Sequence, residues 1–388
     1  IYKEDFKYFK LLNSAMITVL GFGKIGKNIV SDLSKYSTKT KVIVYDPIAI
    51  KSSEQRGNIK FINADPLSIE NRDKVFSRDS IIISALPADM RATVYRLAKD
   101  KHSKLVDIAF GNDDISDYLD DDSDRDYTIV PDAGVAPGIS NILVGRFAAE
   151  LDQVTDVKIY VGGIPEIPVE PLDYKLTFSS ESLVDEYVNT ARIVESGKIV
   201  EKEPLSGIEY FDFEGINHKL EAFYTDGLRT LLKTIKANNM SEKTVRYAGH
   251  SQKVKLLRDL GLFDSEERVL NNIKIKPRNL MEKLFDEKLI FPAIGDILLL
   301  TVNVSGMKNG AVKNLSARLL YSVKANKEYT AMSMTTGCPA SIIAQLLEEG
   351  YLNIHGLVPP ELIGKEKRYF DAIIKRLEDR GIKIKISD

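Results

Sequence analysis

The chain has 388 residues, of which 44% are hydrophobic and 28% charged, and its formal net charge is −2. This length exceeds what one compact core accommodates and predicts two domains, while the composition is typical of a globular protein in water. The balance of acidic and basic residues, with no block of lysine and arginine, argues against a nucleic-acid partner.

The cysteines, histidines and hydrophobic runs exclude further classes of protein. Cys338 is the only cysteine and the four histidines are far apart, so we expect neither a disulfide framework nor a metal site. No hydrophobic run approaches the ~20 residues of a membrane span, and the first residues lack the order of a signal peptide. We therefore expect a cytoplasmic protein with no membrane partner.

Short hydrophobic segments alternate with segments of helical periodicity up to residue 130. The segments predicted as strands are 16–20, 41–46, 59–65, 80–87, 104–110 and 127–130. They are continuously hydrophobic, which is expected when helices cover both faces of a parallel sheet. Residues 1–138 are therefore predicted to form an α/β domain with a Rossmann-type doubly wound parallel sheet, preceded by an extension over 1–15.

After Gly138 the hydrophobic residues alternate with polar ones, as in antiparallel strands with one solvated face. We expect an inserted α+β domain with an antiparallel sheet over 139–330. It should include a strand over 173–179, a helix over 181–197 with Gly197 at its C-terminal cap, and a long hairpin over 296–323. Residues 331–388 are predicted to form C-terminal helices that pack back on the first domain, followed by a closing strand.

A glycine motif of the form G-x-G-x-x-G lies between the first strand and the first helix. Its residues are Gly21, Phe22, Gly23, Lys24, Ile25 and Gly26. In this setting the first glycine permits a tight turn, the second lets a pyrophosphate approach, and the third lets helix and strand pack closely. The helix N-terminus offers free N–H groups to the phosphates. A tight turn without a ligand is the alternative.

Residues at the ends of the following strands extend the predicted cofactor site. Asp46 ends the second strand twenty residues after Gly26, where a carboxylate accepts hydrogen bonds from ribose hydroxyls and repels a 2′-phosphate. No arginine follows it, so NAD is favoured over NADP. Asp65 is expected either near the adenine or as a cap of the next helix. Ligands bind at the carboxyl ends of such strands, so the last residues of the fourth strand should border the nicotinamide. These residues are Ala85, Leu86 and Pro87.

Residues 129–141, with the sequence "IVPDAGVAPGISN", follow the sixth strand at the predicted domain boundary. Their small residues suit a hinge. Gly134 and Gly138 would also allow close approach to a flat ring, with Asp132 as a polar group beside it. Both interpretations are open on the segment alone.

Several motifs together resemble the saccharopine dehydrogenase-like family. They are "GFGKIGKNI", "ISALP", "PDAGVAPGISN", "YVGGIP", "LEAFYTDGLRTLL", "TVRYAGH" and "TTGCPASIIAQLLEEG". Residues 1–15 lie outside the resemblance, and Ala248 stands where relatives often have proline. Within the family, the chain is most similar to enzymes that use NAD to oxidise the ε-amine of lysine. The resemblance implies a homodimer and an active site between the domains, with Asp132, Gly134, Ala136 and Pro137 near the nicotinamide.

Amine oxidation by hydride transfer needs a base, because only the free amine can release hydride. His250 titrates in the useful pH range, and its alternative role is that of a structural residue at a helix N-terminus. Asp132 is a second candidate base; it could also hold the cationic amine or simply form a turn.

Binding of the substrate carboxylate is the other requirement. Arg246 is suited to bidentate capture of a carboxylate, or it could form a surface ion pair. Thr225 and Asp226 lie where a strand gives way to a helix, and such an N-terminus also binds carboxylates. Asp226 could orient an amine or cap the helix. We expect Arg246 and His250 to face the nicotinamide.

Two other functions compete with lysine oxidation. A saccharopine or carboxypolyamine dehydrogenase would need a pocket for a second, carboxylate-bearing arm of its amino-acid substrate. A non-catalytic NAD-sensing regulator would not need the polar residues of "TDG" and "RYAGH" beside the ring. These residues therefore favour an enzyme over a sensor. Arg246 is the only obvious carboxylate-binding residue in the named motifs, which favours a small substrate over one with a second carboxylate-bearing arm.

Overall fold

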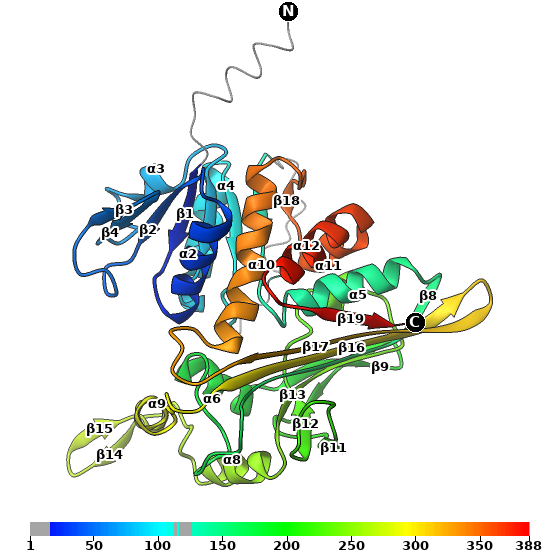
Figure 1. The fold of residues 1–388 in the computed structure, drawn as a ribbon. Helices are drawn as coiled ribbons and strands as arrows, with labels where there is room; N and C mark the ends of the chain where they lie inside the picture. The colour runs from blue at the N-terminus through cyan, green and yellow to red at the C-terminus, as the bar shows by residue number, and fades with distance from the viewer. Residues whose placement is uncertain (1–15, 112–114, 116–125, 388) are drawn as a thin grey trace, which may run out of the picture. The chain divides into compact units, whose positions relative to one another are not determined.

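The structure is a computed structural model that describes residues 16–111, 115 and 126–387. It divides into two compact units (Figure 1). The first comprises Ile1–Gly111, Ile115–Val135 and Thr336–Pro360, and the second comprises Asn112–Asp114, Ala136–Thr335 and Glu361–Asp388. The predicted extension over 1–15 lies outside the described residues. Within the described part of the chain, every helix is too short or too polar to cross a bilayer.

The first unit contains an eight-stranded sheet in the order β18-β7-β6-β5-β1-β2-β4-β3. All neighbouring strands are parallel except β3, which pairs antiparallel with β4. The strands are β1 (Met16–Leu20), β2 (Lys41–Tyr45), β3 (Glu54–Arg56), β4 (Ile59–Ile62), β5 (Ile81–Ser84), β6 (Lys104–Asp107), β7 (Thr128–Val130) and β18 (Gly356–Leu357). This order confirms the predicted Rossmann-type doubly wound sheet.

Helices follow the strands of this sheet as the alternating pattern predicted. They are α2 (Lys24–Tyr36), α3 (Arg72–Val75), the 3-10 turn η1 (Ala88–Met90), α4 (Arg91–Asp100) and, from residue 336 onward, α10 (Ala331–Glu348). Right-handed crossovers from β1 to β2 and from β5 to β6 lead in opposite directions, which places α2 and α4 on opposite faces. The strand order therefore reverses between β1 and β5, the position where such folds bind ligands.

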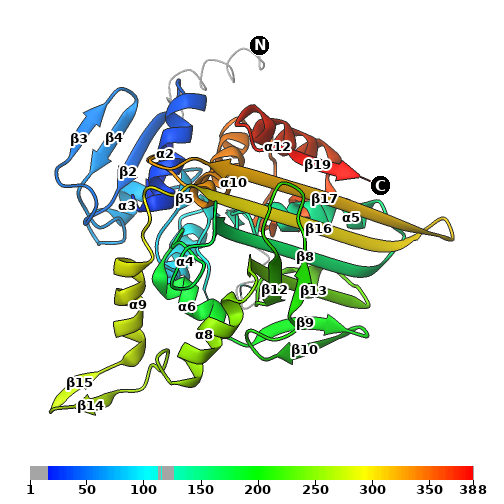
Figure 2. The same ribbon diagram turned by 60° about the horizontal axis from the view of Figure 1, so that its bottom comes forward.

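The second unit contains a nine-stranded sheet (Figure 2). Its main path is β10-β9-β13-β8-β16-β17-β19, while β12 pairs with β13 and β11. The strands are β8 (Gln153–Pro165), β9 (Ala191–Glu195), β10 (Lys198–Lys202), β11 (Glu209–Phe211), β12 (Leu220–Tyr224), β13 (Asn239–Tyr247), β16 (Asp296–Lys308), β17 (Ala311–Val323) and β19 (Ile384–Ser387). Strand β13 is parallel to β8 and the other pairs are antiparallel, so the sheet is mixed rather than wholly antiparallel.

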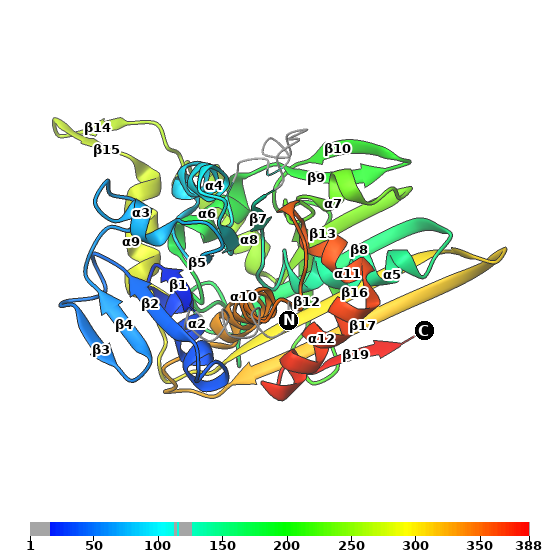
Figure 3. The same cartoon turned by 90° about the horizontal axis from the view of Figure 1, so that it is seen from above.

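Helices and a small hairpin complete the second unit. They are α5 (Ile139–Ala149), α6 (Ser180–Val188), α7 (Leu231–Thr234), α8 (His250–Asp259), α9 (Pro277–Lys288), α11 (Pro360–Lys365), α12 (Lys367–Asp379), β14 (Arg268–Leu270) and β15 (Ile273–Ile275). Helix α6 packs against α8 and α9 (Figure 3). Side chains from these helices form a core with Phe223 of β12 and Tyr174.

The long hairpin predicted over 296–323 is confirmed as β16 and β17. Its turn is Asn309-Gly310, and both residues have positive φ, 52° and 80°. A two-residue turn of this kind matches the twist of the flanking strands, and asparagine followed by glycine is the sequence that favours it.

Two predicted elements are wrong. The helix expected over 181–197 ends at Val188, and Ala191–Glu195 forms strand β9, paired with β10. Gly197 lies in the turn between them with φ of 75°, so it caps no helix. No strand forms over 173–179, because these residues lead into α6, whose N-cap is Ser179. Over 181–197 the local pattern suited helix and strand alike, and the pairing of β9 with β10 decided the outcome.

Candidate functional site

The glycine loop of the first unit connects β1 with α2. Gly21 has φ of 93°, and a Cβ atom there would lie 2.6 Å from the carbonyl oxygen of Ala85. A Cβ atom on Gly26 would collide with the carbonyl of Gly21. At Gly23, by contrast, a Cβ atom would meet no protein atom within 4 Å. The first and third glycines thus serve packing within the protein, while the second borders open space.

The N-terminus of α2 has the features of an anion site. Gly23 is the N-cap residue and has no side chain that could occupy the free N–H groups, and the first turn contains no acidic residue. Gly23 and Lys24 are exposed. Free N–H groups and the positive end of the helix dipole attract phosphate groups, so this loop fits the pyrophosphate of a dinucleotide.

Asp46 follows β2 and is joined to the glycine loop. Its Oδ2 accepts a hydrogen bond from the N–H of Phe22 at 2.7 Å, and its Oδ1 accepts from Ile48 at 2.7 Å and Ala49 at 2.6 Å. Burial raises the pKa of Asp46, but these three donors outweigh it and hold the pKa below its usual value. A carboxylate oxygen accepts two hydrogen bonds, so Oδ2 retains capacity for a ribose hydroxyl.

The two loop glycines provide a matched pair of variants. Gly23→Ala should leave the melting temperature within about 2 °C, because the new methyl group meets open space, yet dinucleotide affinity should fall at least about tenfold. Gly21→Ala should instead destabilise the first unit. Alanine rarely adopts the positive φ of position 21, and its Cβ atom would clash with the Ala85 carbonyl. Thermal unfolding and fluorescence titration with NADH measure the two effects. Unchanged NADH affinity in Gly23→Ala would contradict this placement of the pyrophosphate.

Other predicted cofactor residues lie near the same edge of the sheet. The Ala85 N–H donates to Leu20 at 2.8 Å, which places Ala85, Leu86 and Pro87 next to the glycine loop. The Asp65 side chain accepts from the N–H of Leu67 at 2.9 Å, as in a local turn. The proposed adenine contact of Asp65 stays a prediction.

Asp132 lies in a buried charge cluster of the first unit. Its Oδ1 is 3.9 Å from Nη2 of Arg91, whose Nε donates to Asp107 at 3.2 Å. Tyr95 also donates to Asp107, at 3.1 Å. Burial raises the pKa of Asp107 while the Arg91 guanidinium lowers it, with a net increase. Asp107 pairs with Ser84 across β5 and β6, so the cluster lies at the same carboxyl edge as the glycine loop.

The segment around Asp132 is closely packed. Asp132 has φ of 48°, and both it and Gly134 are buried. The first unit ends at Val135, and Ala136 and Pro137 begin the second. The side chain of Asp132 is held by a cation, which suits an anchored loop. Its role as a base stays a prediction.

In the second unit, Arg246 of β13 forms a buried ion pair rather than a surface pair. Its Nη2 is 2.6 Å from the carboxylate of Glu186 on α6, and the two side chains are 2% and 18% exposed. The guanidinium lies 4.8 Å from the ring centre of Tyr174. Burial lowers the pKa of Arg246, but Glu186 outweighs it and raises the pKa, so Arg246 stays charged. A buried, charged guanidinium is suited to binding a carboxylate.

His250 begins α8 and is fully buried, with both ring nitrogens engaged. Nδ1 lies 2.7 Å from the carbonyl of Leu172, and Nε2 lies 2.9 Å from the hydroxyl of Tyr187. A carbonyl can only accept, so Nδ1 donates to it and Nε2 accepts from Tyr187. Burial, aided by Arg246, lowers the pKa of His250 to about 3, so the ring is neutral at neutral pH. These contacts are those of a structural residue, and catalysis by His250 stays a prediction.

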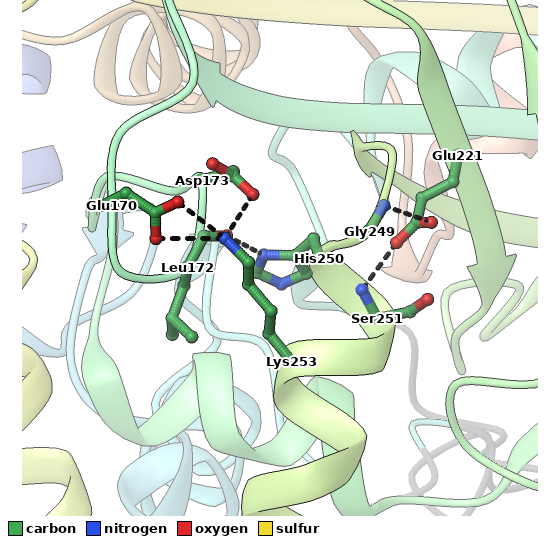
Figure 4. A network of polar contacts seen from close by, with 8 residues as sticks. All are labelled: Glu170, Leu172, Asp173, Glu221, Gly249, His250, Ser251 and Lys253. Atoms are coloured by element: carbon green, nitrogen blue, oxygen red, sulfur yellow. Dashed lines mark hydrogen bonds and ion pairs between the residues drawn. The ribbon is translucent and has the colours of Figure 1, made fainter.

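The start of α8 is fixed by a carboxylate from the neighbouring strand (Figure 4). Glu221 of β12 accepts hydrogen bonds from the N–H groups of Gly249 at 2.9 Å and Ser251 at 2.6 Å. On the other side, Lys253 pairs with Asp173 at 2.7 Å and Glu170 at 3.1 Å. Together these contacts hold His250 beside Tyr174, where Arg246 also lies.

Thr225 and Asp226 bind different partners. Asp226 forms a bidentate ion pair with Arg192 of β9, in which Nη2 and Oδ2 are 2.8 Å apart. The Thr225 hydroxyl donates to Oε2 of Glu242 at 2.5 Å and lies 3.0 Å from the hydroxyl of Thr244. Thr225, directly after β12, therefore belongs to a buried hydrogen-bonded group with Glu242 and Thr244 of β13. The predicted substrate contacts of Thr225 and Asp226 stay predictions.

Sequence reasoning missed Glu242, Glu186 and Arg91. A signal for Glu242 was present, because Glu242, Thr244 and Arg246 alternate along β13 and therefore share one face. All three are buried, which is unusual for successive polar residues on one face of a strand. Glu186 gave no such signal, because its partner Arg246 is sixty residues away in the chain.

A glycine loop of this geometry, at the reversal point of a doubly wound parallel sheet, is the dinucleotide-binding arrangement of Rossmann proteins. A family model described as the saccharopine dehydrogenase C-terminal domain matches residues 134–382, well over half of the chain. The chain therefore belongs to the saccharopine dehydrogenase family.

Relatives and solved structures agree with this assignment. Saccharopine dehydrogenase (NADP+, L-glutamate-forming) of Saccharomyces cerevisiae is 23% identical over 278 residues, covering 67% of this chain and 60% of that protein. The enzyme of the same name from Pyricularia oryzae is 24% identical over 230 residues, covering 53% and 49%. The matches thus span about half to three fifths of these relatives' length. The apo structure of saccharopine dehydrogenase (L-Glu forming) from S. cerevisiae has a TM-score of 0.75 at 18% identity, covering 96% of this chain and 99% of that chain, which shows the shared fold.

Proposed function

We propose that this chain is a nicotinamide-dinucleotide-dependent oxidoreductase that acts on a carbon–nitrogen bond of an amino acid. More narrowly, we propose that it removes the ε-amine of L-lysine oxidatively, with NAD as the oxidant. The observation that carries the proposal is the glycine loop with open space at Gly23, in a chain of the saccharopine dehydrogenase family.

The proposed mechanism assigns binding roles to both units. The α2 N-terminus would hold the pyrophosphate, and Asp46 would hold the ribose hydroxyls. The dinucleotide, when bound, supplies the hydride acceptor. Arg246 would bind the substrate carboxylate, and its ion pair with Glu186 and contact with Tyr174 would fix its orientation. The substrate ammonium must lose a proton before hydride can leave, and water then adds to the imine.

The preference for NAD is proposed on the basis of Asp46. Asp46→Asn keeps the size of the side chain but removes the charge that repels a 2′-phosphate. The ratio of kcat/KM for NAD to that for NADP should therefore fall at least about tenfold, mainly through KM. Steady-state kinetics with both cofactors measure it. Wild-type protein that already prefers NADP would contradict the proposal.

Saccharopine dehydrogenase activity is the second candidate, because the curated relatives carry that name. Saccharopine has a second, carboxylate-bearing arm, so its binding would require a cation besides Arg246. The discriminating experiment is a spectrophotometric assay at 340 nm with lysine, saccharopine and a carboxylated polyamine, each with NAD and NADP. Turnover of lysine supports the first proposal, turnover of saccharopine replaces it with the second, and no turnover of any amine contradicts both.

We also propose that the chain forms a homodimer. The support is the wide sheet of the second unit, whose exposed hydrophobic side chains include Ile199, Tyr210 and Leu320. Light scattering at micromolar concentration should give twice the chain mass of 43.5 kDa. A mass of one chain would contradict the proposal.

A further inference from the structure

We propose that Glu242, Thr225 and Thr244 form a proton-accepting chain in the second unit, which takes up the proton of a substrate ammonium group bound beside Arg246. This inference rests on the proposed function in one respect, namely that the substrate carries an amine. It gives Glu242 a role that no motif indicated.

The chain is continuous and buried. Oε2 of Glu242 accepts from the Thr225 hydroxyl at 2.5 Å, and this hydroxyl lies 3.0 Å from that of Thr244. The three side chains belong to residues that are 3–6% exposed. Glu242 packs against the backbone at Gly227, where a Cβ atom would lie 2.5 Å from its carboxyl carbon. The carboxyl group is thus fixed in place at one end of the chain.

The surroundings of Glu242 favour its protonated form near neutral pH. Burial raises the pKa of Glu242 to about 8, against the opposing hydrogen bonds from Thr225 and Gly227. Two charged groups act on Glu242, namely Glu186 of α6 and Asp226 in the loop after β12, and both are acidic. Asp226 is itself paired with Arg192 of β9. Glu242 therefore gains and loses its proton in the pH range where an amine dehydrogenase needs a base.

The other end of the chain, at Thr244, lies two positions before Arg246 on β13. Thr244 and Arg246 lie on the same face of β13, about 7 Å apart along the strand. The Nε atom of Arg246 is buried without a hydrogen bond among the described residues. The Tyr174 hydroxyl interacts with Thr177, and the Tyr174 ring lies against Arg246. A buried N–H donor without an acceptor costs free energy, so the Arg246 Nε atom points to a bound acceptor such as a carboxylate.

The chemistry of these groups defines the ligand. Arg246 suits a carboxylate, while the hydroxyls suit an amine, so the ligand class is an amino acid with a second amino group. The ammonium passes a proton to the Thr244 oxygen as the Thr244 proton moves to Thr225 and the Thr225 proton moves to the Glu242 carboxylate. The products are a neutral amine and a neutral carboxylic acid, so charge and protons balance. His250 cannot serve this chain directly, because both its ring nitrogens are engaged.

The test is the pH dependence of lysine binding without a dinucleotide, measured by calorimetry between pH 6 and 9.5. For the wild type, affinity should rise about tenfold per pH unit and level off near pH 8, where free Glu242 becomes ionised. In a plot of affinity against pH, this change of slope near pH 8 is the break that Glu242 should cause. Glu242→Gln should remove the break and weaken lysine binding at pH 8 at least about tenfold. Thr225→Val, which keeps the shape but interrupts the chain, should also remove the break.

Two controls separate the proton chain from other effects. Norleucine lacks the second amine, so its binding affinity should show no change of slope near pH 8 with the wild type or with Glu242→Gln. Glu209→Gln should retain the wild-type break, because Glu209 pairs with Lys243 on the other face of β13. A break that persists in Glu242→Gln, or that appears with norleucine, would overturn the inference, as would absence of lysine binding. Lysine binding with the expected break but no turnover with NAD or NADP would support the inference and contradict the proposed function.

Discussion

Glu186→Gln is expected to lower the free energy of unfolding by about 3 kcal/mol, because it leaves the guanidinium of Arg246 buried without its counter-charge. Arg246 is 2% exposed and cannot lose its proton to relieve the cost, whereas Glu186 is 18% exposed. Arg246→Met should therefore cost less than Glu186→Gln, because a lone Glu186 can be protonated or hydrated. Urea unfolding monitored by circular dichroism measures both variants.

The double variant Glu186→Gln, Arg246→Met is the control for this pair. If the ion pair accounts for the loss, the double variant should be more stable than Glu186→Gln alone, because no buried charge remains. Additive losses would show that each side chain contributes through packing instead. The same variants separate stability from substrate binding, because only those lacking Arg246 lose the proposed carboxylate contact.

Glu242→Gln should remove the pH dependence that Glu242 imposes on stability. Burial raises the pKa of Glu242 from 4.5 to about 8, so between these values the folded protein holds a proton that the unfolded chain has lost. Stability therefore falls as pH rises from about 4.5 to 8, and this group causes no further loss above pH 8. One pKa unit corresponds to about 1.4 kcal/mol, so the loss is at most about 5 kcal/mol. The isosteric glutamine lacks this loss.

The measurement is urea unfolding of both proteins at pH 5, 6, 7 and 8. The stability of Glu242→Gln relative to the wild type should increase steadily with pH over this range. A constant difference would mean that Glu242 keeps an ordinary pKa in the folded protein. The proton-accepting chain would then lose its electrostatic basis, while the assignment of the glycine loop would be unaffected.

Parts of the fold and site were predictable because their contacts are local. The glycine loop, β1 and α2 lie within twenty-one residues, and the hairpin of β16 and β17 carries its turn signal at Asn309-Gly310. The parallel pairing of β13 with β8 was not predictable, because alternation along a strand does not fix its direction. The boundary between α6 and β9 was missed because partners elsewhere in the sheet select the strand.

The same distinction applies to side chains. Asp46 could be placed from its spacing, since its contact with the Phe22 backbone belongs to a recurrent motif. The ion pair of Arg246 with Glu186 depends on how α6 packs on the sheet, and no spacing rule specifies it. Arg91 likewise joins Asp107 and Asp132 only after three separate strand ends are assembled.

The order in which the strands are synthesised has a consequence for folding. The sheet of the first unit is completed by β18, which pairs with β7, and the Thr128 hydroxyl donates to Ile354, 226 positions later. The edge strand β19 of the second unit pairs with β17 and comes later still. On a growing ribosomal chain, the first sheet is complete only after α10 has been made, and the second only after α12. Folding should therefore be slow, because it depends on non-local contacts. Until β18 and β19 pair with them, the edges of β7 and β17 are unpaired and prone to aggregation.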